Sequence, residues 1–252
     1  VTKSYYADVM GIPVDKIVSV SVMPCTAKKH ELGRDDQGAD GYQDVDYSLT
    51  TRELARMIKM AGIEFMKLED EPYDNPLGEY TGAGVIFGAT GGVMEAALRT
   101  AVEKLTGEEL VDLDFVDVRG VKGVKEAEYE LQGKKVKVAV ASGLANARII
   151  MDKVKAGEAD YTFIEIMGCP GGCVNGGGQP HVDSQVRNFI DVRAERAKGL
   201  YTLDKNAPIR KAHENPVIVK MYDDYLGVPG GEKAHHLLHT SYINRGVNKQ
   251  AD

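Results

Sequence analysis

The sequence predicts a protein of the α/β class, because segments patterned like strands alternate along the chain with segments patterned like helices. The strand-like segments are residues 17–22, 124–131, 135–140 and 161–167. The helix-like segments are residues 52–60, 90–105 and 145–155, and from about residue 190 the chain is helical with interruptions at Pro208, Pro216 and Pro229. We therefore expect mixed β-sheets flanked by helices, followed by a helical C-terminal tail.

The first third of the chain has clear start and stop signals. Residues 2–10 have a helical pattern, and residues 17–22 alternate apolar and small side chains, which predicts a strand that runs directly into Met23-Pro24-Cys25. Thr50 and Glu53 have the spacing of a capping box, so we expect a helix over residues 52–60 that ends at Gly62.

The middle of the chain predicts a helix, a hairpin and a buried strand. The helix over residues 90–105 should end at Gly107. Gln132-Gly133 lies between two strand-like segments and predicts a β-hairpin. Residues 161–167 are apolar and β-branched, and a glycine-rich turn follows them. In α/β proteins, such a turn at the end of a buried strand is a common place for a ligand.

Composition limits the classes of partner. The chain has 252 residues, 43% of them hydrophobic, which is enough for a substantial core in one or two units. Its net charge of −7 argues against nucleic acid and against an anionic membrane surface. We recognise no targeting segment and no apolar run long enough for a membrane span. We expect a soluble, cytoplasmic protein with no nucleic-acid or membrane partner.

Residues 165–180 contain six glycines and two of the three cysteines. A flexible linker would be rich in glycine and serine and would avoid cysteine, methionine and proline. Nucleotide binding is disfavoured by spacing, because the chain has no phosphate-loop pattern and the third glycine of a dinucleotide fingerprint falls on Phe87. Dense glycine is what a backbone needs when it must wrap closely around a group that is not a side chain.

The three cysteines are Cys25, Cys169 and Cys173. So few exclude a disulfide scaffold. Cys169 and Cys173 are four residues apart, so on a helical turn their sulfurs would face the same way. Three thiolates are one short of the four ligands of a zinc site or a four-iron cluster. His30 or His181 could complete a zinc site, but soft methionines and backbone N–H groups near the cysteines favour iron–sulfur ligation.

Two motifs carry a family resemblance. Residues 23–31, Met-Pro-Cys-x-x-Lys-x-x-Glu, resemble the second signature motif of the [FeFe]-hydrogenases. Residues 165–180, Glu-x-Met-x-Cys-x-x-x-Cys-x-x-Gly-Gly-Gly-Gln-Pro, resemble the third. Further blocks similar to the family's catalytic domain are residues 50–54, 82–95, 213–216 and 234–242. The last two lie in a tail that resembles the part some members carry as a separate small subunit.

One family signature, Thr-Ser-Cys-Cys-Pro-x-Trp, is absent, and the chain has no tryptophan. The resemblance therefore implies the C-terminal portion of a two-lobed catalytic domain whose N-terminal portion is missing or is another polypeptide. We expect a large-subunit region over residues 1–182 and a small-subunit-like tail over residues 183–252. The missing segment would supply the fourth cysteine ligand.

The resemblance also implies the site residues. Cys25, Cys169 and Cys173 would hold a [4Fe-4S] cluster, and Cys173 would also bridge to a two-iron subcluster carrying carbon monoxide, cyanide and a bridging dithiolate, which together form the H-cluster. Lys28 would donate to a cyanide nitrogen, so it counts with Cys173 as catalytic. The other residues expected to line the cofactor are Met23, Pro24, Phe87, Met167, Gly171 and Gln179.

Some residues keep two interpretations. Glu31 and Glu165 could be hydrogen-bond acceptors near the cluster or charges at helix ends. His30 and His181 fit surface or hydrogen-bonding roles better than ligation, and His213 is expected to tie the tail to the core.

The expected function is reversible H2 oxidation and proton reduction, as part of a hydrogenase served by maturation proteins and by an electron carrier such as ferredoxin, or by nicotinamide through other subunits. The alternative is a non-catalytic relative that assembles iron–sulfur clusters or acts as a sensor. The intact Lys28 and the complete run of residues 176–180 favour the enzyme.

Overall fold

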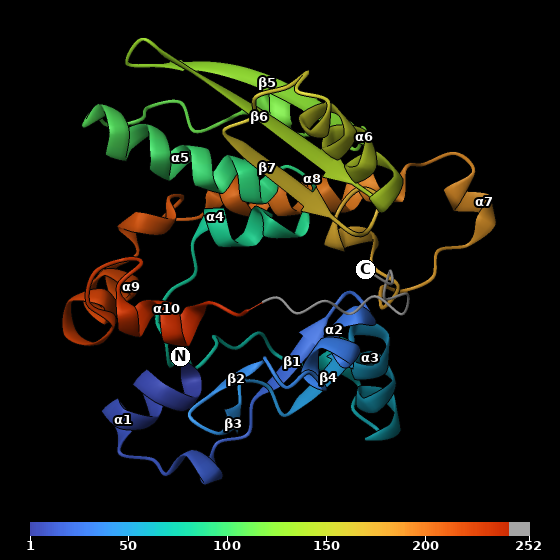
Figure 1. Cartoon of the computed structure of the whole chain (residues 1–252). Helices are drawn as coiled ribbons and strands as arrows, with labels where there is room; N and C mark the ends of the chain where they lie inside the picture. Colours follow the sequence, from blue (N-terminus) through green and yellow to red (C-terminus); the bar gives the residue numbers. More distant parts are fainter. Residues whose placement is uncertain (242–252) are drawn as a thin grey trace, which may run out of the picture. The chain divides into compact units, whose positions relative to one another are not determined.

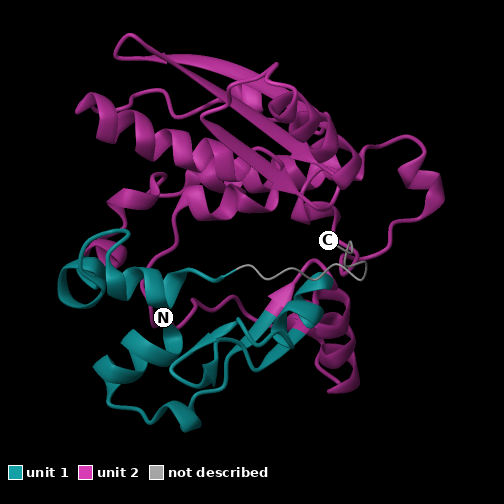
Figure 2. Ribbon diagram, viewed as in Figure 1, with its two compact units in different colours: residues 1–21, 27–48, 220–252 teal, residues 22–26, 49–219 magenta. Residues whose placement is uncertain are grey.

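The computed structural model describes residues 1–241 and divides the chain into two compact units (Figure 2). Within the described residues, unit 1 contains residues 1–21, 27–48 and 220–241. Unit 2 contains residues 22–26 and 49–219, and therefore all three cysteines. Each unit is described by itself.

A three-stranded mixed sheet forms the centre of unit 2 (Figure 1). Its strands, in the order β5-β6-β7, are β5 (Val124–Leu131), β6 (Lys134–Ser142) and β7 (Phe163–Met167). β5 and β6 form the predicted hairpin and are antiparallel, whereas β7 is parallel to β6. Gln132 and Gly133 at the turn have φ of 49° and 74°. Two successive positive φ values give a turn whose twist matches that of the strands.

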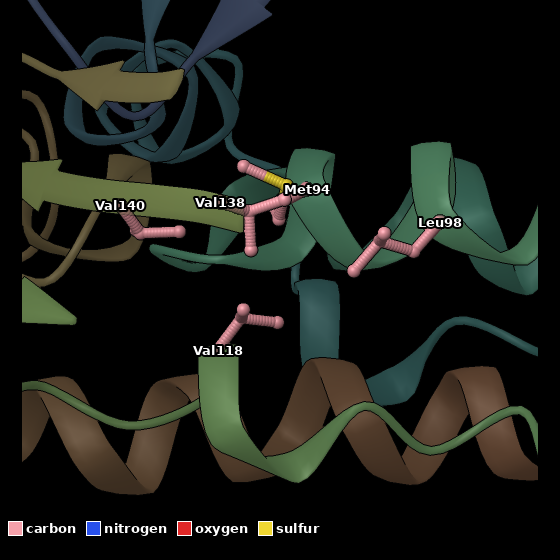
Figure 3. Close-up of a cluster of buried hydrophobic side chains, with 5 residues drawn as sticks. All are labelled: Met94, Leu98, Val118, Val138 and Val140. Atoms are coloured by element: carbon pink, nitrogen blue, oxygen red, sulfur yellow. The ribbon is translucent and has the colours of Figure 1, made fainter. Parts of the chain in front are cut away.

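The second half of β6, residues 138–142, is buried on both faces, since successive side chains point to opposite sides of the sheet and all five residues are buried. On one face Val138 and Val140 pack against α5 (Gly92–Thr106), with Met94, Leu98 and Val118 completing the cluster (Figure 3). On the other face Ala139 and Ala141 pack with Ala147 and Ile150 of α6 (Leu144–Lys155). The sheet therefore lies between two helical layers, as the α/β prediction requires.

Helix α5 confirms the predicted helix and its stop. Gly107 follows the last helical residue with φ of 71° and donates its N–H to the carbonyl oxygen of Glu103, so it closes the helix in a left-handed conformation. The helix begins at Gly92, two residues after the predicted start. Thr90 and Gly91 form a turn before the helix, with φ of 92° at Gly91.

Two further helices and a short turn pack on the α5 side of the sheet (Figure 1). They are α4 (Gly82–Val85), η4 (Ile86–Gly88) and α8 (Val192–Asn206). Arg99 of α5, which is fully buried, makes two parallel hydrogen bonds of 2.7 and 2.8 Å to the carboxylate of Asp204 on α8. Glu95 also accepts from Arg99 at 2.7 Å, so the buried guanidinium is fully paired.

Unit 2 is completed by elements around this core. The predicted capping box is confirmed, since Thr50 Oγ1 accepts the N–H of Glu53 at 3.2 Å and Glu53 Oε2 accepts the N–H of Thr50 at 2.8 Å. This capping box lies at the start of α3 (Thr51–Met60). The remaining elements are η3 (Phe65–Lys67), η5 (Val116–Val118), η6 (Cys173–Asn175), α7 (Ser184–Arg187), η7 (Ala212–Glu214) and α9 (Pro216–Met221). The last two residues of α9 belong to unit 1.

Unit 1 is built from short elements. They are η1 (Thr2–Tyr6), α1 (Ala7–Met10), η2 (Val14–Lys16), α2 (Ala27–Leu32), β2 (Gly38–Ala39), β3 (Tyr42–Gln43), η8 (Tyr222–Leu226) and α10 (Glu232–Leu238). Asp46 anchors its first segment by accepting from Lys3 Nζ and from the N–H of Ser19, both at 2.7 Å. The boundary between the units crosses the two-stranded sheet of β1 (Val20–Met23) and β4 (Tyr47–Thr50).

The helical tail is confirmed where the structure describes it. α8, α9 and α10 follow one another, and Pro216 is the first residue of α9, a position that lacks a helical hydrogen-bond partner in any case. Tyr242 and the last ten residues of the predicted tail region lie outside the described residues. None of the helices in residues 1–241 is both long and apolar enough to cross a bilayer.

Candidate functional site

The glycine run of residues 176–178 lies directly against Pro24, although about 150 residues separate them in the chain. The N–H of Gly178 donates to the carbonyl oxygen of Pro24 at 2.8 Å. A Cβ on Gly176 would lie 2.3 Å from that same oxygen, and one on Gly178 would lie 2.8 Å from Cβ of Thr50. Only glycine fits at these two positions, and the fit places Cys25 beside the segment that carries Cys169 and Cys173.

The chain between Cys169 and Cys173 is not a helical turn, so the case in which their four-residue spacing would make the two sulfurs face the same way does not apply. Gly171 and Gly172 have φ of 86° and 97°, in the left-handed region that a right-handed helix excludes. The N–H of Gly172 donates to the carbonyl oxygen of Cys169 at 3.0 Å and closes a tight turn. Cys173 then begins the short helix η6.

All three cysteines are free, with Cys25 and Cys169 half-buried and Cys173 exposed. Within residues 1–241 the side chains close enough to share one metal ion are Glu103, His213 and Glu214, and no cysteine is among them. Zinc ligation through His181 is disfavoured, because His181 Nε2 lies 2.6 Å from Arg52 Nη1 and a guanidinium can only donate. A four-iron cluster fits this donor set better, because each iron takes its own thiolate and the sulfurs need not converge.

Both predicted methionines are half-buried and lie at the end of a strand. The carbonyl oxygen of Met23 accepts from Thr51 Oγ1 at 3.4 Å, and that of Met167 accepts the N–H of Gly143 at 2.8 Å. Their backbones are thus held, while their flexible thioether side chains are free to fill irregular space beside the cysteine segments.

The turn that carries Phe87 adjoins the cysteine loop. A Cβ on Gly172 would lie 2.8 Å from the carbonyl oxygen of Gly88, and Phe87 itself is 47% exposed. Gln179 is half-buried, and its N–H donates to the carbonyl oxygen of Gly176 at 3.1 Å. Gly171 is buried between the two loop cysteines, and protein groups engage both its N–H and its carbonyl oxygen.

Lys28 lies in the first turn of α2 in unit 1, three residues after Cys25. Its ammonium forms an ion pair with Glu31 one turn further along the helix, and 47% of its side chain is exposed. Glu31 is therefore the partner of the predicted cyanide donor. An exposed pair of this kind contributes little to stability, so the ammonium can exchange Glu31 for another anion at small cost.

Glu165 is a charge at a helix end, which decides between its two interpretations. Its Oε1 accepts the N–H of Gly91 at 2.6 Å and its Oε2 accepts the N–H of Met94 at 2.8 Å, both at the start of α5. Helix α5 has no side-chain cap of its own, so a buried carboxylate from β7 supplies one.

Sequence reasoning missed two arginines that hold the outer side of the glycine run. Arg52 Nη2 donates to the carbonyl oxygen of Gly177 at 2.8 Å. Arg196 donates to the carbonyl oxygens of Val174 and Pro180, both at 3.0 Å. No local pattern marks either residue, although Arg52 lies inside one of the blocks that resemble the family.

The comparisons with known proteins agree with this geometry. The family profile described as "Iron only hydrogenase large subunit, C-terminal domain" matches residues 1–177, and that described as "Iron hydrogenase small subunit" matches residues 190–245. The chain is 49% identical to iron hydrogenase 1 of Clostridium pasteurianum over 241 residues, which cover 96% of this chain and 42% of that protein. It thus spans less than half of that hydrogenase's length.

Two other relatives show the breadth of the similarity. The protein NAR1 of Arabidopsis thaliana is 33% identical over 256 residues, covering 95% of this chain and 53% of that protein. A solved structure of a variant of the [FeFe]-hydrogenase HydA1 from Chlamydomonas reinhardtii matches with a TM-score of 0.79 and 42% identity, covering 98% of this chain and 68% of that one. With the mixed sheet, the close contact of residues 176–178 with Pro24 and both motifs in place, the chain belongs to the family of iron-only hydrogenases, of whose large subunit it carries the C-terminal domain.

Proposed function

We propose that this chain is part of an [FeFe]-hydrogenase that catalyses reversible H2 oxidation and proton reduction. The observation that carries the proposal is the glycine cradle, in which Gly176 and Gly178 close on Pro24 and bring the Cys25 segment to the Cys169–Cys173 loop. Relatives named as hydrogenases support the same class of reaction at the family level.

In this proposal the three thiolates would hold a [4Fe-4S] cluster, and Cys173, the exposed one, would also carry a two-iron subcluster with carbon monoxide, cyanide and dithiolate ligands. When bound, that subcluster would supply the centre at which H2 is split and formed. Lys28 would hold it by donating to a cyanide, exchanging its ion pair with Glu31 for this contact. Met23, Pro24, Phe87, Met167, Gly171 and Gln179 would form the surrounding wall.

The wall has a chemical role of its own. Thioether and aromatic side chains exclude water from an inorganic cluster, which strengthens the hydrogen bonds that its anionic ligands accept. The arginines on the outer side of the glycine run fix the carbonyl groups of Val174, Gly177 and Pro180. The thiolate of Cys173 therefore projects from a backbone whose following carbonyl groups are fixed.

Three cysteines leave a four-iron cluster one ligand short. We therefore propose that an N-terminal segment, fused or as a separate chain, supplies the fourth thiolate, and that residues 183–252 act as the small-subunit-like tail. Maturation proteins and an electron carrier such as ferredoxin would be the partners, in the cytoplasm. The match covers 41% and 42% of two curated hydrogenases, so those proteins are long enough to include such a segment.

The alternative is an iron–sulfur assembly protein, and a relative named cytosolic iron-sulfur assembly component 3, from Rattus norvegicus, fits it with 32% identity, whereas the hydrogenase relative is 49% identical. Infrared spectroscopy of the complete protein, produced with hydrogenase maturation factors, separates the two. Carbonyl and cyanide stretching bands are expected for a hydrogenase. Iron–sulfur absorption without these bands would overturn the enzymatic proposal.

The ligand set has its own test. In the complete protein, Cys25→Ser and Cys169→Ser should each abolish cluster binding, because a hydroxyl is a much poorer ligand for iron than a thiolate. Thr26→Ser, beside Cys25 and exposed, is the matched control and should keep its iron. Full iron content in either cysteine variant would refute the assignment.

A further inference from the structure

One peptide group before helix α5 lies between two buried, oppositely charged side chains. The carbonyl oxygen of Thr90 accepts from Lys125 Nζ at 2.9 Å, and the N–H of Gly91, in the same peptide group, donates to Glu165 Oε1 at 2.6 Å. Lys125 and Glu165 are each only 5% exposed. Charge-assisted hydrogen bonds at both ends fix the plane of this peptide group.

The reason for this arrangement lies at Gly91. A Cβ there would lie 1.8 Å from the carbonyl oxygen of Val118, and φ is 92°, so only glycine fits. A glycine offers no side-chain cap, and Glu165 supplies it from β7. Lys125 is held in turn by the carbonyl oxygen of Gly120 at 2.9 Å. Burial lowers the pKa of Lys125 to about 8, although the nearby Glu165 opposes this.

The same turn holds the cysteine loop. The N–H of Thr90 donates to the carbonyl oxygen of Gly171 at 3.1 Å, and the N–H of Gly171 donates to Ser142 Oγ at 3.2 Å. Gly171 is thus fixed on both sides, by the turn before α5 and by the end of β6. A Cβ on Gly172 would lie 2.6 Å from the Thr90 nitrogen, so the two backbones are in direct contact.

We propose that Glu165 and Lys125 are positioning residues for the thiolates of Cys169 and Cys173. They fix the Thr90–Gly91 peptide group, this group fixes Gly171, and Gly171 sets the loop from which both sulfurs project. The inference rests on the proposed function in one respect, that these cysteines hold an iron–sulfur cluster. Neither Glu165 nor Lys125 is assigned a contact with the cluster.

The test uses Glu165→Gln, Glu165→Ala and Lys125→Met in the complete protein. Glu109→Gln and Lys104→Met, at exposed positions, are the matched controls. The measurements are iron and sulfide content after reconstitution, the electron paramagnetic resonance spectrum of the reduced cluster, and the rate of iron release to a chelator. All measurements are made under conditions in which circular dichroism shows that the variant is folded.

We expect iron release to be about 10- to 100-fold faster in Glu165→Ala, which is the size of the affinity loss usually caused by removing a residue that orients a metal ligand. Glu165→Gln should lie between wild type and Glu165→Ala, because the amide keeps one of the two acceptor oxygens. Lys125→Met, which lacks any donor, should also release iron faster. The spectrum of the reduced cluster should change in the same order, and the controls should match wild type.

A purely structural role for these residues predicts a different result. Thermal unfolding of the apoprotein would then occur at a lower temperature, while the cluster spectrum and the release rate of folded variants stayed at wild-type values. That outcome would overturn the inference and leave the proposed function intact. A wild-type protein that takes up no iron would instead overturn the proposed function, and the inference with it.

Discussion

The two glycines that directly precede Cys169 and Cys173 differ in what they tolerate. Gly172 has φ of 97°, and a Cβ there would lie 2.6 Å from the Thr90 nitrogen and 2.8 Å from the carbonyl oxygen of Gly88. Gly168 has no atom within 4 Å of a Cβ and no positive φ. Dihedral strain and close contact therefore act together at one position and are absent from the other.

Gly172→Ala should lower the free energy of unfolding by about 2–4 kcal/mol, from a positive φ and an overpacked contact. It should also reduce the iron content, because the loop must shift at Cys173. Gly168→Ala should change neither, which chemical denaturation and iron analysis can check. Equal behaviour of the two variants would show that the close fit at Gly172 is not needed.

Lys28→Asn should keep the [4Fe-4S] cluster but prevent stable binding of the two-iron subcluster, because an anionic group would lose its charge-assisted donor. Lys29→Asn, at the next exposed position, is the control and should load fully. Electron paramagnetic resonance detects the first cluster, and infrared bands detect the second. Wild-type H2 evolution by Lys28→Asn would remove Lys28 from the site.

At the residue scale, the sequence could predict residues that belong to motifs and could not predict residues that act on them from a distance. The segments of Cys25 and Cys169 were predicted to form one site, and the glycine cradle does bring them together. Lys125 and Ser142 carry no local signal. Their roles arise only when β5 and β6 are placed beside the turn before α5.

Helix α5 is tied at its C-terminal end as firmly as at its start. Glu103 accepts from Lys211 Nζ at 2.5 Å, from the N–H of Leu110 at 2.7 Å and from His213 Nε2 at 2.7 Å. Burial works against the ionised carboxylate, but these three donors outweigh it and hold the pKa of Glu103 at about 2. His213 also contacts Thr100, so it ties this segment to α5 as expected.

Glu103→Gln should cost about 2 kcal/mol of stability at neutral pH, because hydrogen bonds to a charged group are lost. Because the pKa of Glu103 is lower in the folded state, its ionised carboxylate stabilises the fold fully at pH values above the unfolded pKa of 4.5. This stabilisation is lost as the pH falls toward the folded pKa of about 2. The stability difference between wild type and variant should therefore be constant above about pH 5.5 and shrink below it. Urea unfolding across this range, with the exposed Glu158→Gln as control, measures it.

At the element scale, signals from neighbouring residues predicted helix and hairpin boundaries correctly, whereas the conformation of the glycine-rich loop could not be predicted. The capping box at Thr50, the stop at Gly107 and the hairpin at Gln132-Gly133 depend on neighbouring residues, and all three were predicted correctly. The spacing of Cys169 and Cys173 left open whether they lie on one helical turn, and they do not, because Gly171 and Gly172 adopt positive φ. Close contact with Thr90 and Gly88 selects that conformation, and it is not visible in the sequence.

At the scale of the whole molecule, mixed sheets and helices were predictable, but the grouping of segments was not. Unit 1 joins the first 21 residues and residues 27–48 to residues 220–241. This grouping depends on side-chain contacts between distant segments, such as the hydrogen bond from Tyr225 to Asp8 at 3.0 Å. No periodic pattern in either segment predicts that the two lie together.

The 252-residue chain, produced alone with all maturation factors, should evolve no H2 and bind iron poorly. Its three cysteines leave the cluster one ligand short, and large apolar side chains such as Met60, Phe65 and Met66 are 81%, 61% and 93% exposed. Adding a segment with the Cys-Cys-Pro motif, fused or as a second chain, should restore both iron binding and turnover. Measurable turnover by the isolated chain would contradict this view of it as a partial domain.

The buried pair of Arg99 and Asp204 has a consequence for how such a protein can be divided. Arg99 belongs to the region that matches the large-subunit profile, and Asp204 to the region that matches the small-subunit profile. Separating the two regions would take the Asp204 carboxylate away from Arg99, which would keep only that of Glu95. A nick in the connecting residues 178–189 should therefore leave the two pieces associated. The same contact would let a separately synthesised small-subunit-like chain bind at the same position. The association of the two regions would then not depend on a covalent link at residues 178–189.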